Sequence, residues 1–179
     1  MKANQEVIIA TETIDEGREA LNQHLIKDIM DAGHGSKLTL ASCFRTRWNM
    51  HESSQAFALL GNGAIDIAKR FYTQEYDEDG NHRDYNLRVS ESWGLIYKKG
   101  DKTGMHHHFP SLWSYVYCVK ASSKCSPLVF PTVEDYSVKP EEGQIILFPG
   151  YLYHEVPEQT CDYERIMVAG NIMWDGWKD

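Results

Sequence analysis

The second half of the chain is a series of short apolar runs separated by turn residues, and this pattern limits the folds open to it. The runs are rich in β-branched and aromatic residues, which is the composition of β-strands. Many short strands with Gly, Pro or polar turns between them indicate a sandwich or barrel-like sheet. In order from about Leu87, the runs are RVSESWGLIYKK, LWSYVYCVK, PLVFP, GQIILFPGYLYHEVP and RIMVAGNIMW.

A first helix is predicted near the N-terminus. Thr13 or Asp15 can cap it, and Gly33 is expected to end it. Because an α-helix returns to the same face every three or four residues, its apolar positions should form one stripe. These positions are Ala20, Leu21, Leu25, Ile29 and Met30.

A second helix is expected to begin at Ser53 or Ser54 and to break at Gly61-Asn62-Gly63, before an acidic turn at 77–80. Its apolar side is formed by Phe57, Leu60, Ile67 and Phe71. Two helices followed by a run of strands indicate an α+β, mainly β chain. We expect a double-stranded β-helix (jelly-roll) core, with the N-terminal helices bracing one face.

The length of 179 residues suits one domain with a full hydrophobic core. Residues 1–85 are predicted to be helical support and residues 86–175 the jelly-roll core. The chain has no internal repeat and no Pro/Gly/Ser-rich linker, which agrees with a single domain over 1–179.

Composition disfavours two classes of partner. The formal net charge is −8, from 18 basic and 26 acidic residues, so the chain lacks the positive field of a general nucleic-acid binder. No apolar run is long enough to span a membrane, and the N-terminal residues do not resemble a secretory signal. The four cysteines form no CxxC pair and are expected to be reduced thiols in a cytoplasmic protein.

Three consecutive histidines, at 106–108, are the first candidate for chemistry. Side chains alternate between the two faces of an extended segment, so His106 and His108 should point the same way and His107 the opposite way. Two imidazoles on one face make a chelating pair for a transition metal. A histidine run also occurs as a polar surface loop, so the run alone is a weak signal.

His154 supplies a distant partner for this pair. It lies 46 positions after His108, just beyond a Phe-Pro-Gly break that follows an apolar strand. In a jelly roll these two segments come from adjacent antiparallel strands, so the three imidazoles can meet at the mouth of the barrel. The combination predicts a metal site, although a single histidine here would more often be a hydrogen-bonded core residue.

Arg165 opens the last apolar strand, RIMVAGNIMW, eleven positions after His154. An unpaired buried guanidinium is costly, so such an arginine must reach solvent or hold an anion. Its donor fork fits a carboxylate bidentately. Arg165 can therefore anchor the far carboxylate of a dicarboxylate that chelates the metal, or it can pair with Glu164 or Asp162 at the rim.

Four motifs extend these residues into an ordered set that spans the second half of the chain. The first is W-x-x-x-Y-x-x-G-D, from Trp93 to Asp101. The second is H-x-H followed by Pro and an S-x-V-Y strand, and the third is E-G-x-x-x-x-F-P with H-x-V-P. The fourth is an E-R-I strand that ends in Asn. With this set, the stretch from Trp93 to Trp174 resembles the 2-oxoglutarate/Fe(II)-dependent oxygenases of the double-stranded β-helix class.

The resemblance implies an Fe(II)- and 2-oxoglutarate-dependent dioxygenase, with ascorbate as a candidate reductant. By the same resemblance, His106, His108 and His154 would hold Fe(II), and Arg165 would bind the C5 carboxylate of 2-oxoglutarate. Tyr97 and Ser114 are further candidates for cosubstrate contacts, although Tyr97 could equally be a core aromatic residue. The resemblance identifies no primary substrate, which could be a small molecule or a macromolecule.

The sequence departs from the family pattern at two positions. The best-known members of the wider class bind iron with H-x-D, whereas His108 stands in the carboxylate position here. Many relatives carry Tyr-Tyr on the next strand, whereas this chain has Tyr117-Cys118. Two alternatives therefore remain: a cupin-type metal-dependent dioxygenase or isomerase without 2-oxoglutarate, and a non-catalytic jelly-roll binding module. The usual cupin motif adds a Glu shortly after H-x-H, and that Glu is absent here.

Overall fold

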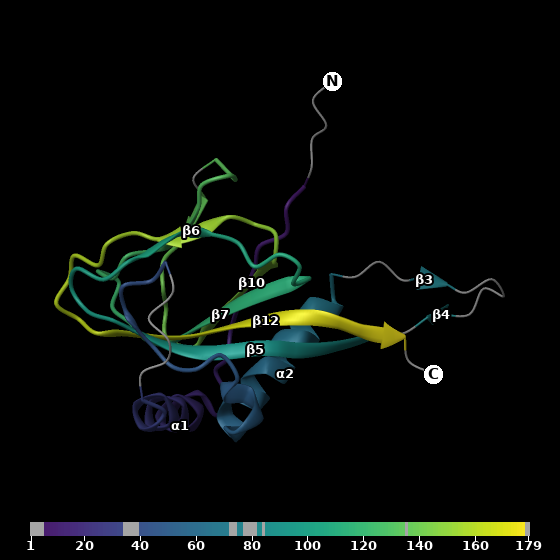
Figure 1. Cartoon of the computed structure of the whole chain (residues 1–179), viewed down its shortest axis with the longest axis horizontal. Helices are drawn as coiled ribbons and strands as arrows, with labels where there is room; N and C mark the ends of the chain where they lie inside the picture. The colour runs from purple at the N-terminus through teal and green to yellow at the C-terminus, as the bar shows by residue number, and fades with distance from the viewer. Residues whose placement is uncertain are drawn as a thin grey trace.

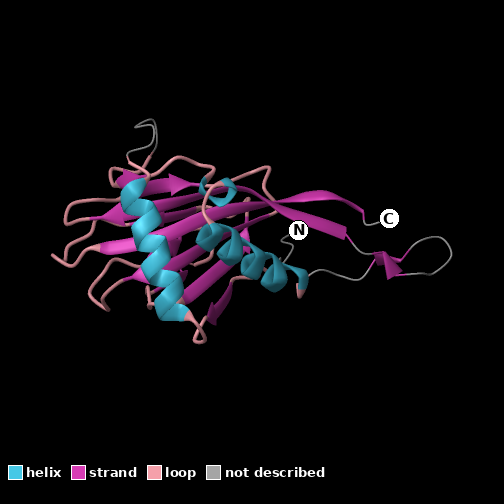
Figure 2. Cartoon of the chain, turned by 90° about the horizontal axis from the view of Figure 1, so that it is seen from below, coloured by secondary structure: helices cyan, strands magenta, loops and turns pink. Residues whose placement is uncertain are grey.

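The structure is a computed structural model that describes residues 6–33, 40–71, 75–76, 82–83, 85–134 and 136–177. Its main body contains two antiparallel β-sheets, with two helices on one side (Figures 1 and 2). This is the predicted double-stranded β-helix braced by helices.

The larger sheet has six strands in the order β1-β10-β7-β12-β5-β2. The strands, in that order, are Ala10–Thr13, Gln144–Pro149, Trp113–Lys120, Arg165–Trp177, Tyr85–Tyr97 and Phe44–Arg45. The smaller sheet has four strands in the order β6-β11-β8-β9. These are Thr103–His106, His154–Val156, Leu128–Phe130 and Tyr136–Val138. A separate short pair joins β3 (Glu75–Tyr76) to β4 (His82–Arg83).

Each face of the six-stranded sheet has its own hydrophobic core, as the alternation of side chains along a strand requires. On β7, Tyr115 and Tyr117 pack toward the helices, whereas Val116 and Cys118 pack toward the four-stranded sheet. The helical layer consists of α1 (Arg18–Asp31), α2 (Gln55–Lys69) and the short 3₁₀ helix η1 (Met50–Glu52). Figure 2 shows the two α-helices lying across one face of the sheet.

Helix α1 is present as predicted, but it begins later than expected. Its N-cap is Gly17 rather than Thr13 or Asp15. The reason is that the preceding residues up to Thr13 form β1, which pairs with β10 at the edge of the large sheet. Leu25 and Ile29 are buried as the helical spacing predicts, whereas Met30 is half exposed.

Helix α2 confirms the predicted cap and corrects the predicted break. The side chain of Ser54 accepts a hydrogen bond from the Phe57 N–H at 3.2 Å. The helix then runs without interruption through the glycines. A Cβ added at Gly61 would lie 2.6 Å from Cγ2 of Val89, so this glycine allows the helix to approach β5 closely. Phe71, expected on the apolar side, lies beyond the helix end and is 38% exposed.

The N-terminal part is more than a helical support. It also contributes β1 and β2 to the two edges of the large sheet, so the expected boundary at residue 86 does not separate helices from strands. The predicted acidic turn at 77–80 lies outside the described residues. Among the described helices, none is long and apolar enough to cross a membrane.

Candidate metal centre

Two of the predicted ligand histidines are direct neighbours across paired strands. β6 and β11 are antiparallel, and His106 lies opposite His154 in their register. His108 follows two residues after β6 ends, and its backbone N–H donates to the carbonyl of Gly150 at 2.7 Å. A Cβ at Gly150 would lie only 2.1 Å from the carbonyl oxygen of Ser111, so the Phe-Pro-Gly sequence lets these two loops come together.

The three imidazoles form a compact cluster. Ring centroids are 4.3 Å apart for His106 and His154, 4.9 Å for His106 and His108, and 5.0 Å for His108 and His154. One ligand nitrogen from each ring lies within 4.8 Å of the other two. Within the described chain, no carboxylate or thiol joins this group. The arrangement offers three nitrogen ligands and leaves other coordination positions to small molecules.

Backbone carbonyls orient two of these rings. Nδ1 of His106 is 2.8 Å from the carbonyl of Gly104, and Nδ1 of His154 is 3.0 Å from that of Leu152. A neutral imidazole that donates through Nδ1 presents the lone pair of Nε2, and such carbonyl contacts are typical of metal-binding histidines. Both rings are therefore held in the tautomer suited to metal binding through Nε2.

The cluster favours neutral, metal-binding imidazoles over protonated ones. Burial lowers the pKa of His106, and burial together with the neighbouring His106 lowers the pKa of His108 to about 3. Burial is also the main reason that the pKa of His154 lies well below its ordinary value, with His106 and His108 adding to the effect. A metal ion requires deprotonated imidazoles, so these shifts agree with such a site.

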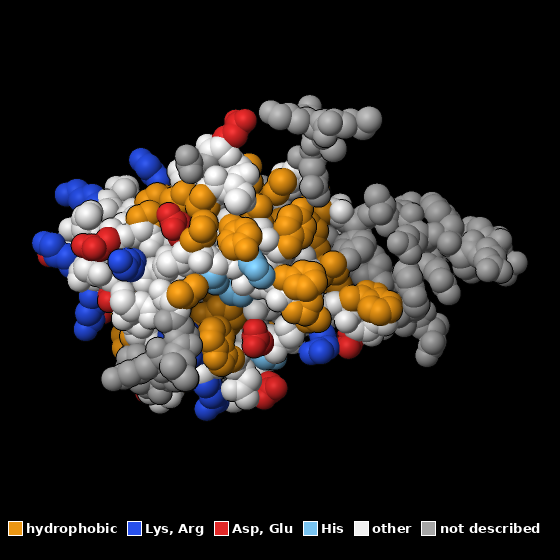
Figure 3. Space-filling model, turned by 45° about the horizontal axis from the view of Figure 1, so that its top comes forward, with side chains coloured by type: hydrophobic (Ala, Val, Ile, Leu, Met, Phe, Trp, Pro, Cys, Tyr) orange, Lys and Arg blue, Asp and Glu red, His pale blue; other side chains and the backbone are white. Residues whose placement is uncertain are grey.

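His107 lies outside the cluster, as the alternation of side chains predicts. Its ring packs against Tyr153, with centroids 4.8 Å apart and planes at 90°. Its Nδ1 accepts a hydrogen bond from the backbone N–H of Phe109. The exposed Phe109 and Tyr153 border this side of the site, and Figure 3 shows histidine side chains surrounded by hydrophobic ones on this face.

A cavity of about 260 Å³ lies between the two sheets, and the three histidines form part of its wall. We call it the central cavity. Its volume is just below the range of roughly 300–1,000 Å³ typical of small-molecule sites. Its walls are mainly apolar and aromatic. All six residues expected at the site line it: His106, His108, His154, Arg165, Tyr97 and Ser114.

Arg165 is buried in this cavity without a carboxylate partner in the described chain. It is 1% exposed, at the first position of β12. Nη1 donates to the carbonyl of Ser126 at 2.5 Å, Cζ lies 5.3 Å from the ring centroid of Tyr97, and Nε has no hydrogen-bond partner. The rim pairings considered for Arg165 do not form, because Glu164 lies near Lys120 and Asp162 pairs with Lys99.

The two further cosubstrate candidates are held by neighbours in the cavity wall. The hydroxyl of Tyr97 shares a 2.6 Å hydrogen bond with that of Thr103, and burial raises the pKa of Tyr97, so it stays protonated. Ser114 donates to Oδ1 of Asn171 at 2.9 Å. The aromatic ring of Tyr97 thus packs against the guanidinium of Arg165. The hydroxyl proton of Ser114 is donated to Asn171 and is not available to a ligand.

Sequence reasoning missed part of the wall of the central cavity. Trp93 packs 5.7 Å from His108, and Trp48 packs on Trp93 with centroids 4.4 Å apart. Arg45 stacks on Trp48, with Cζ 3.7 Å from the ring centroid. Arg45 and Trp48 precede the β-rich half, and no local pattern marked them. The pairing of β2 with β5 brings Arg45 to the site, and the hydrogen bond from the Ser92 N–H to the Trp48 carbonyl holds Trp48 beside β5.

These residues fit a metal ion together with an anionic cosubstrate. Neutral imidazoles, each with an available ring nitrogen, are suitable ligands for iron and related metals. A buried guanidinium with an unsatisfied Nε suits a carboxylate, because an uncompensated buried cation is costly. The two sets of groups line the same cavity.

Comparison with protein families finds a match over residues 130–171 to the family described as "Putative 2OG-Fe(II) oxygenase". The matching segment contains His154 and Arg165, and His106 and His108 precede it. Comparison with curated proteins finds no sequence that matches the chain.

Solved structures with similar folds include several oxygenases. A viral collagen prolyl hydroxylase from Paramecium Bursaria Chlorella virus-1, in a 2OG complex, matches with a TM-score of 0.66 and 17% identity, over 90% of this chain and 94% of that one. A Pseudomonas putida prolyl-4-hydroxylase matches with a TM-score of 0.65 and 15% identity, over 94% of this chain and 93% of that one.

A third similar structure is HygX from Streptomyces hygroscopicus, with nickel and 2-oxoglutarate bound. It matches with a TM-score of 0.65 and 11% identity, over 92% of this chain and 82% of that one. At these identities the structural matches establish the fold, and the family match comes from the sequence itself. The family match over 130–171 and the double-stranded β-helix fold of these structures agree with the resemblance of the sequence to the 2-oxoglutarate/Fe(II) oxygenases.

Proposed function

We propose that the protein is a dioxygenase that hydroxylates a C–H bond of a substrate not yet identified. In the balanced reaction, substrate, 2-oxoglutarate and O2 give hydroxylated substrate, succinate and CO2. Bound Fe(II) would supply the activation of O2 that this reaction requires. The observation that carries the proposal is the buried Arg165, which shares the central cavity with three neutral imidazoles and pairs with no carboxylate in the described chain.

The chain's own residues would bind, orient and shield the reactants. His106, His108 and His154 would hold the metal through Nε2, and the carbonyls of Gly104 and Leu152 would keep two of the rings in place. Arg165 would bind the far carboxylate of 2-oxoglutarate. The apolar walls of the cavity would limit the access of water. No general base is required of the protein, which agrees with the absence of a carboxylate from the histidine cluster.

Tyr97 and Ser114 would have smaller roles. The ring of Tyr97 would support the guanidinium and replace the aromatic contact that the Tyr117-Cys118 sequence lacks. This inference rests on Tyr117 facing the helices, where its hydroxyl donates to Asn22. Ser114 would contribute lone pairs, since its proton is directed to Asn171.

We propose a cytoplasmic protein whose partner is its substrate, either a small molecule or a macromolecule. The four cysteines are free thiols, the state that the cytosol maintains. The net charge of −8 disfavours general nucleic-acid binding.

Anaerobic titration with Fe(II) and 2-oxoglutarate tests the proposal, because the chelate should give a weak visible charge-transfer band. With O2 and ascorbate as reductant, slow formation of succinate is expected even without substrate, and the correct substrate should increase it. Binding of iron without binding of 2-oxoglutarate would favour the cupin-type alternative. Binding of both with no succinate from metabolite, peptide and nucleotide panels would favour a sensing or binding role.

A further inference from the structure

Two cysteines meet in a hydrogen-bond network that also contacts Arg165. Sγ of Cys125 and Sγ of Cys161 are 3.7 Å apart, although the residues are 36 positions apart in sequence. Cys125 lies in the turn between β7 and β8, and Cys161 in the loop between β11 and β12. Cys125 is buried and Cys161 is partly exposed. A small oxidant can therefore reach the sulfur of Cys161, and the sulfur of Cys125 is in position to react next.

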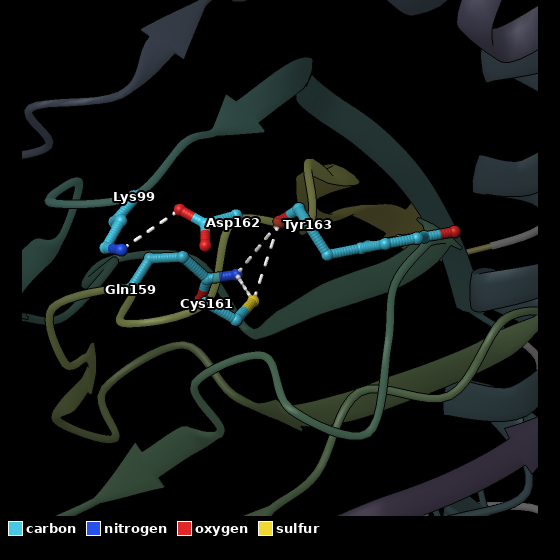
Figure 4. A network of polar contacts seen from close by, with 5 residues as sticks. All are labelled: Lys99, Gln159, Cys161, Asp162 and Tyr163. Atoms are coloured by element: carbon cyan, nitrogen blue, oxygen red, sulfur yellow. Dashed lines mark hydrogen bonds and ion pairs between the residues drawn. The ribbon is translucent and has the colours of Figure 1, made fainter.

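Hydrogen bonds orient both sulfur atoms. The amide of Gln159 donates to Sγ of Cys161 at 3.2 Å, and the backbone N–H of Ser122 donates to Sγ of Cys125 at 3.3 Å. Cys161 in turn contacts the carbonyl of Tyr163. Figure 4 shows Gln159, Cys161 and Tyr163 converging in this network, beside the ion pair of Lys99 with Asp162. The two thiols are therefore held side by side by directed contacts.

The same network supports Arg165. The side chain of Gln159 is fully buried, and its Oε1 accepts from the backbone N–H of Ser126 at 2.9 Å. The carbonyl of Ser126 is the acceptor for Nη1 of Arg165. Cys125 is the residue directly before Ser126, and Cys161 lies four residues before Arg165. A change at the sulfur pair therefore acts on the peptide that positions the guanidinium.

We propose that Cys125 and Cys161 are a redox-sensitive thiol pair, and that their oxidation to a disulfide weakens the binding of 2-oxoglutarate at Arg165. The second half of this inference rests on the proposed function. Peroxide is the oxidant class: it converts the Cys161 thiolate to a sulfenic acid with loss of hydroxide, and the thiol of Cys125 then displaces water. The sum is two thiols and one H2O2 giving one disulfide and two waters.

Closure of the disulfide requires movement close to the anion site. The sulfurs must approach by roughly 1.7 Å to reach a bond of about 2.0 Å. Both residues lie in loops, which can move more readily than paired strands. The displaced Ser126 carbonyl would no longer hold the Arg165 fork in its present orientation, and bidentate binding of a carboxylate depends on that orientation.

The remaining cysteines provide an internal control. Burial raises the pKa of Cys43 and of Cys118 to about 12, so both stay as thiols that react slowly. Only Cys125 and Cys161 are in mutual contact among the cysteines, all of which the structure describes.

The test uses the full chain loaded with Mn(II), which binds like Fe(II) but avoids turnover. Stoichiometric H2O2 is added and removed with catalase, and 2-oxoglutarate is then titrated by calorimetry. Non-reducing peptide mapping should find a Cys125–Cys161 link, with Cys43 and Cys118 still open to alkylation after unfolding. The affinity for 2-oxoglutarate should fall by about tenfold, the scale for weakening one hydrogen bond to a charged group, and dithiothreitol should restore it.

Cys161→Ser is the matched control, because a hydroxyl can still accept from Gln159 but cannot form the disulfide. Its affinity for 2-oxoglutarate should equal that of the reduced parent and stay unchanged after peroxide. The inference is overturned if the reduced parent binds 2-oxoglutarate but peroxide then forms no Cys125–Cys161 disulfide, or forms a disulfide with Cys118 instead. It is also overturned if the protein with the Cys125–Cys161 disulfide binds 2-oxoglutarate as well as the reduced parent does. If the reduced parent does not bind 2-oxoglutarate at all, the proposed function fails instead.

Discussion

At the scale of single residues, the site depends on which neighbours orient each functional group. The tautomers of His106 and His154 follow from two backbone carbonyls. The position of Arg165 follows from the Ser126 carbonyl and the ring of Tyr97. The sequence predicted side chains that line the central cavity, whereas the carbonyls that orient His106, His154 and Arg165 are backbone atoms that no side-chain motif reveals.

His106→Ala and His154→Ala should each abolish metal binding, because either change leaves only two imidazoles in the cluster. His107→Ala is the control and should keep full binding, since its ring packs on Tyr153 outside the cluster. Equilibrium titration with Fe(II) or Mn(II) measures the effect. A loss of metal binding in His107→Ala would show that the assigned ligand set is wrong.

Arg165→Ala should retain the metal and lose affinity for 2-oxoglutarate by about 2–5 kcal/mol, the cost of truncating one partner of a buried charge pair. Arg165→Lys should recover part of the lost affinity for 2-oxoglutarate, because an ammonium group keeps the positive charge but not the donor fork of the guanidinium. Calorimetric titration of the Mn(II)-loaded protein gives both values. Arg88→Ala is the matched control, since this exposed arginine pairs with Asp175. Undiminished binding in Arg165→Ala would support a cupin-type site.

At the scale of elements, helix α2 illustrates how packing overrides a local signal. Its glycines predicted a break, because glycine lowers helix propensity. The helix continues because its apolar side is buried against the six-stranded sheet, where Phe57, Leu60 and Ala64 lie in the core. Gly61 contributes to this packing directly by leaving room for Val89 and Tyr115.

Gly61→Ala and Gly63→Ala should change stability in opposite directions. A Cβ at Gly63 meets nothing within 4 Å, so the variant should gain about 0.5–1 kcal/mol in the free energy of unfolding from helix propensity. A Cβ at Gly61 collides with the stiff side chain of Val89, and overpacking costs about 1–3 kcal/mol, more than the propensity gain. Urea denaturation measures both. Equal stabilisation by the two changes would mean that the approach of α2 to β5 is not tight.

At the scale of the whole molecule, the central cavity exists because two sheets face one another without filling the space near the histidines. Strands β6 and β11 of the small sheet carry His106 and His154, whereas β12 and β5 of the large sheet carry Arg165 and Tyr97. A ligand that contacts both sets therefore bridges the two sheets. Binding should stabilise the folded molecule as a unit.

Mn(II) and 2-oxoglutarate should accordingly raise the melting temperature in two separable steps. Each ligand at about 100 times its dissociation constant adds about 2.7 kcal/mol, or roughly 5–10 °C for a chain of this size. EDTA should reverse both steps, since the cosubstrate would need the metal. Scanning calorimetry makes the measurement. Arg165→Ala should retain the metal step alone, and a full second step in that variant would contradict the bridging role.

The sequence by itself determined the features that local chemistry controls. The alternation and turn residues of the second half specify strands, and Ser54 specifies a helix start. The H-x-H spacing separates His106 and His108 from His107, because neighbouring side chains of an extended segment point in opposite directions.

Only the tertiary structure decided the features that depend on segments far apart in the chain. The residues up to Thr13 join the sheet edge as β1 because β10 offers unpaired backbone groups there, and this moves the start of α1 to Gly17. Arg45 reaches the cavity through β2. Cys125 meets Cys161 because the turn between β7 and β8 lies against the loop between β11 and β12. Such contacts follow from burial and strand pairing across the whole molecule, and no local pattern encodes them.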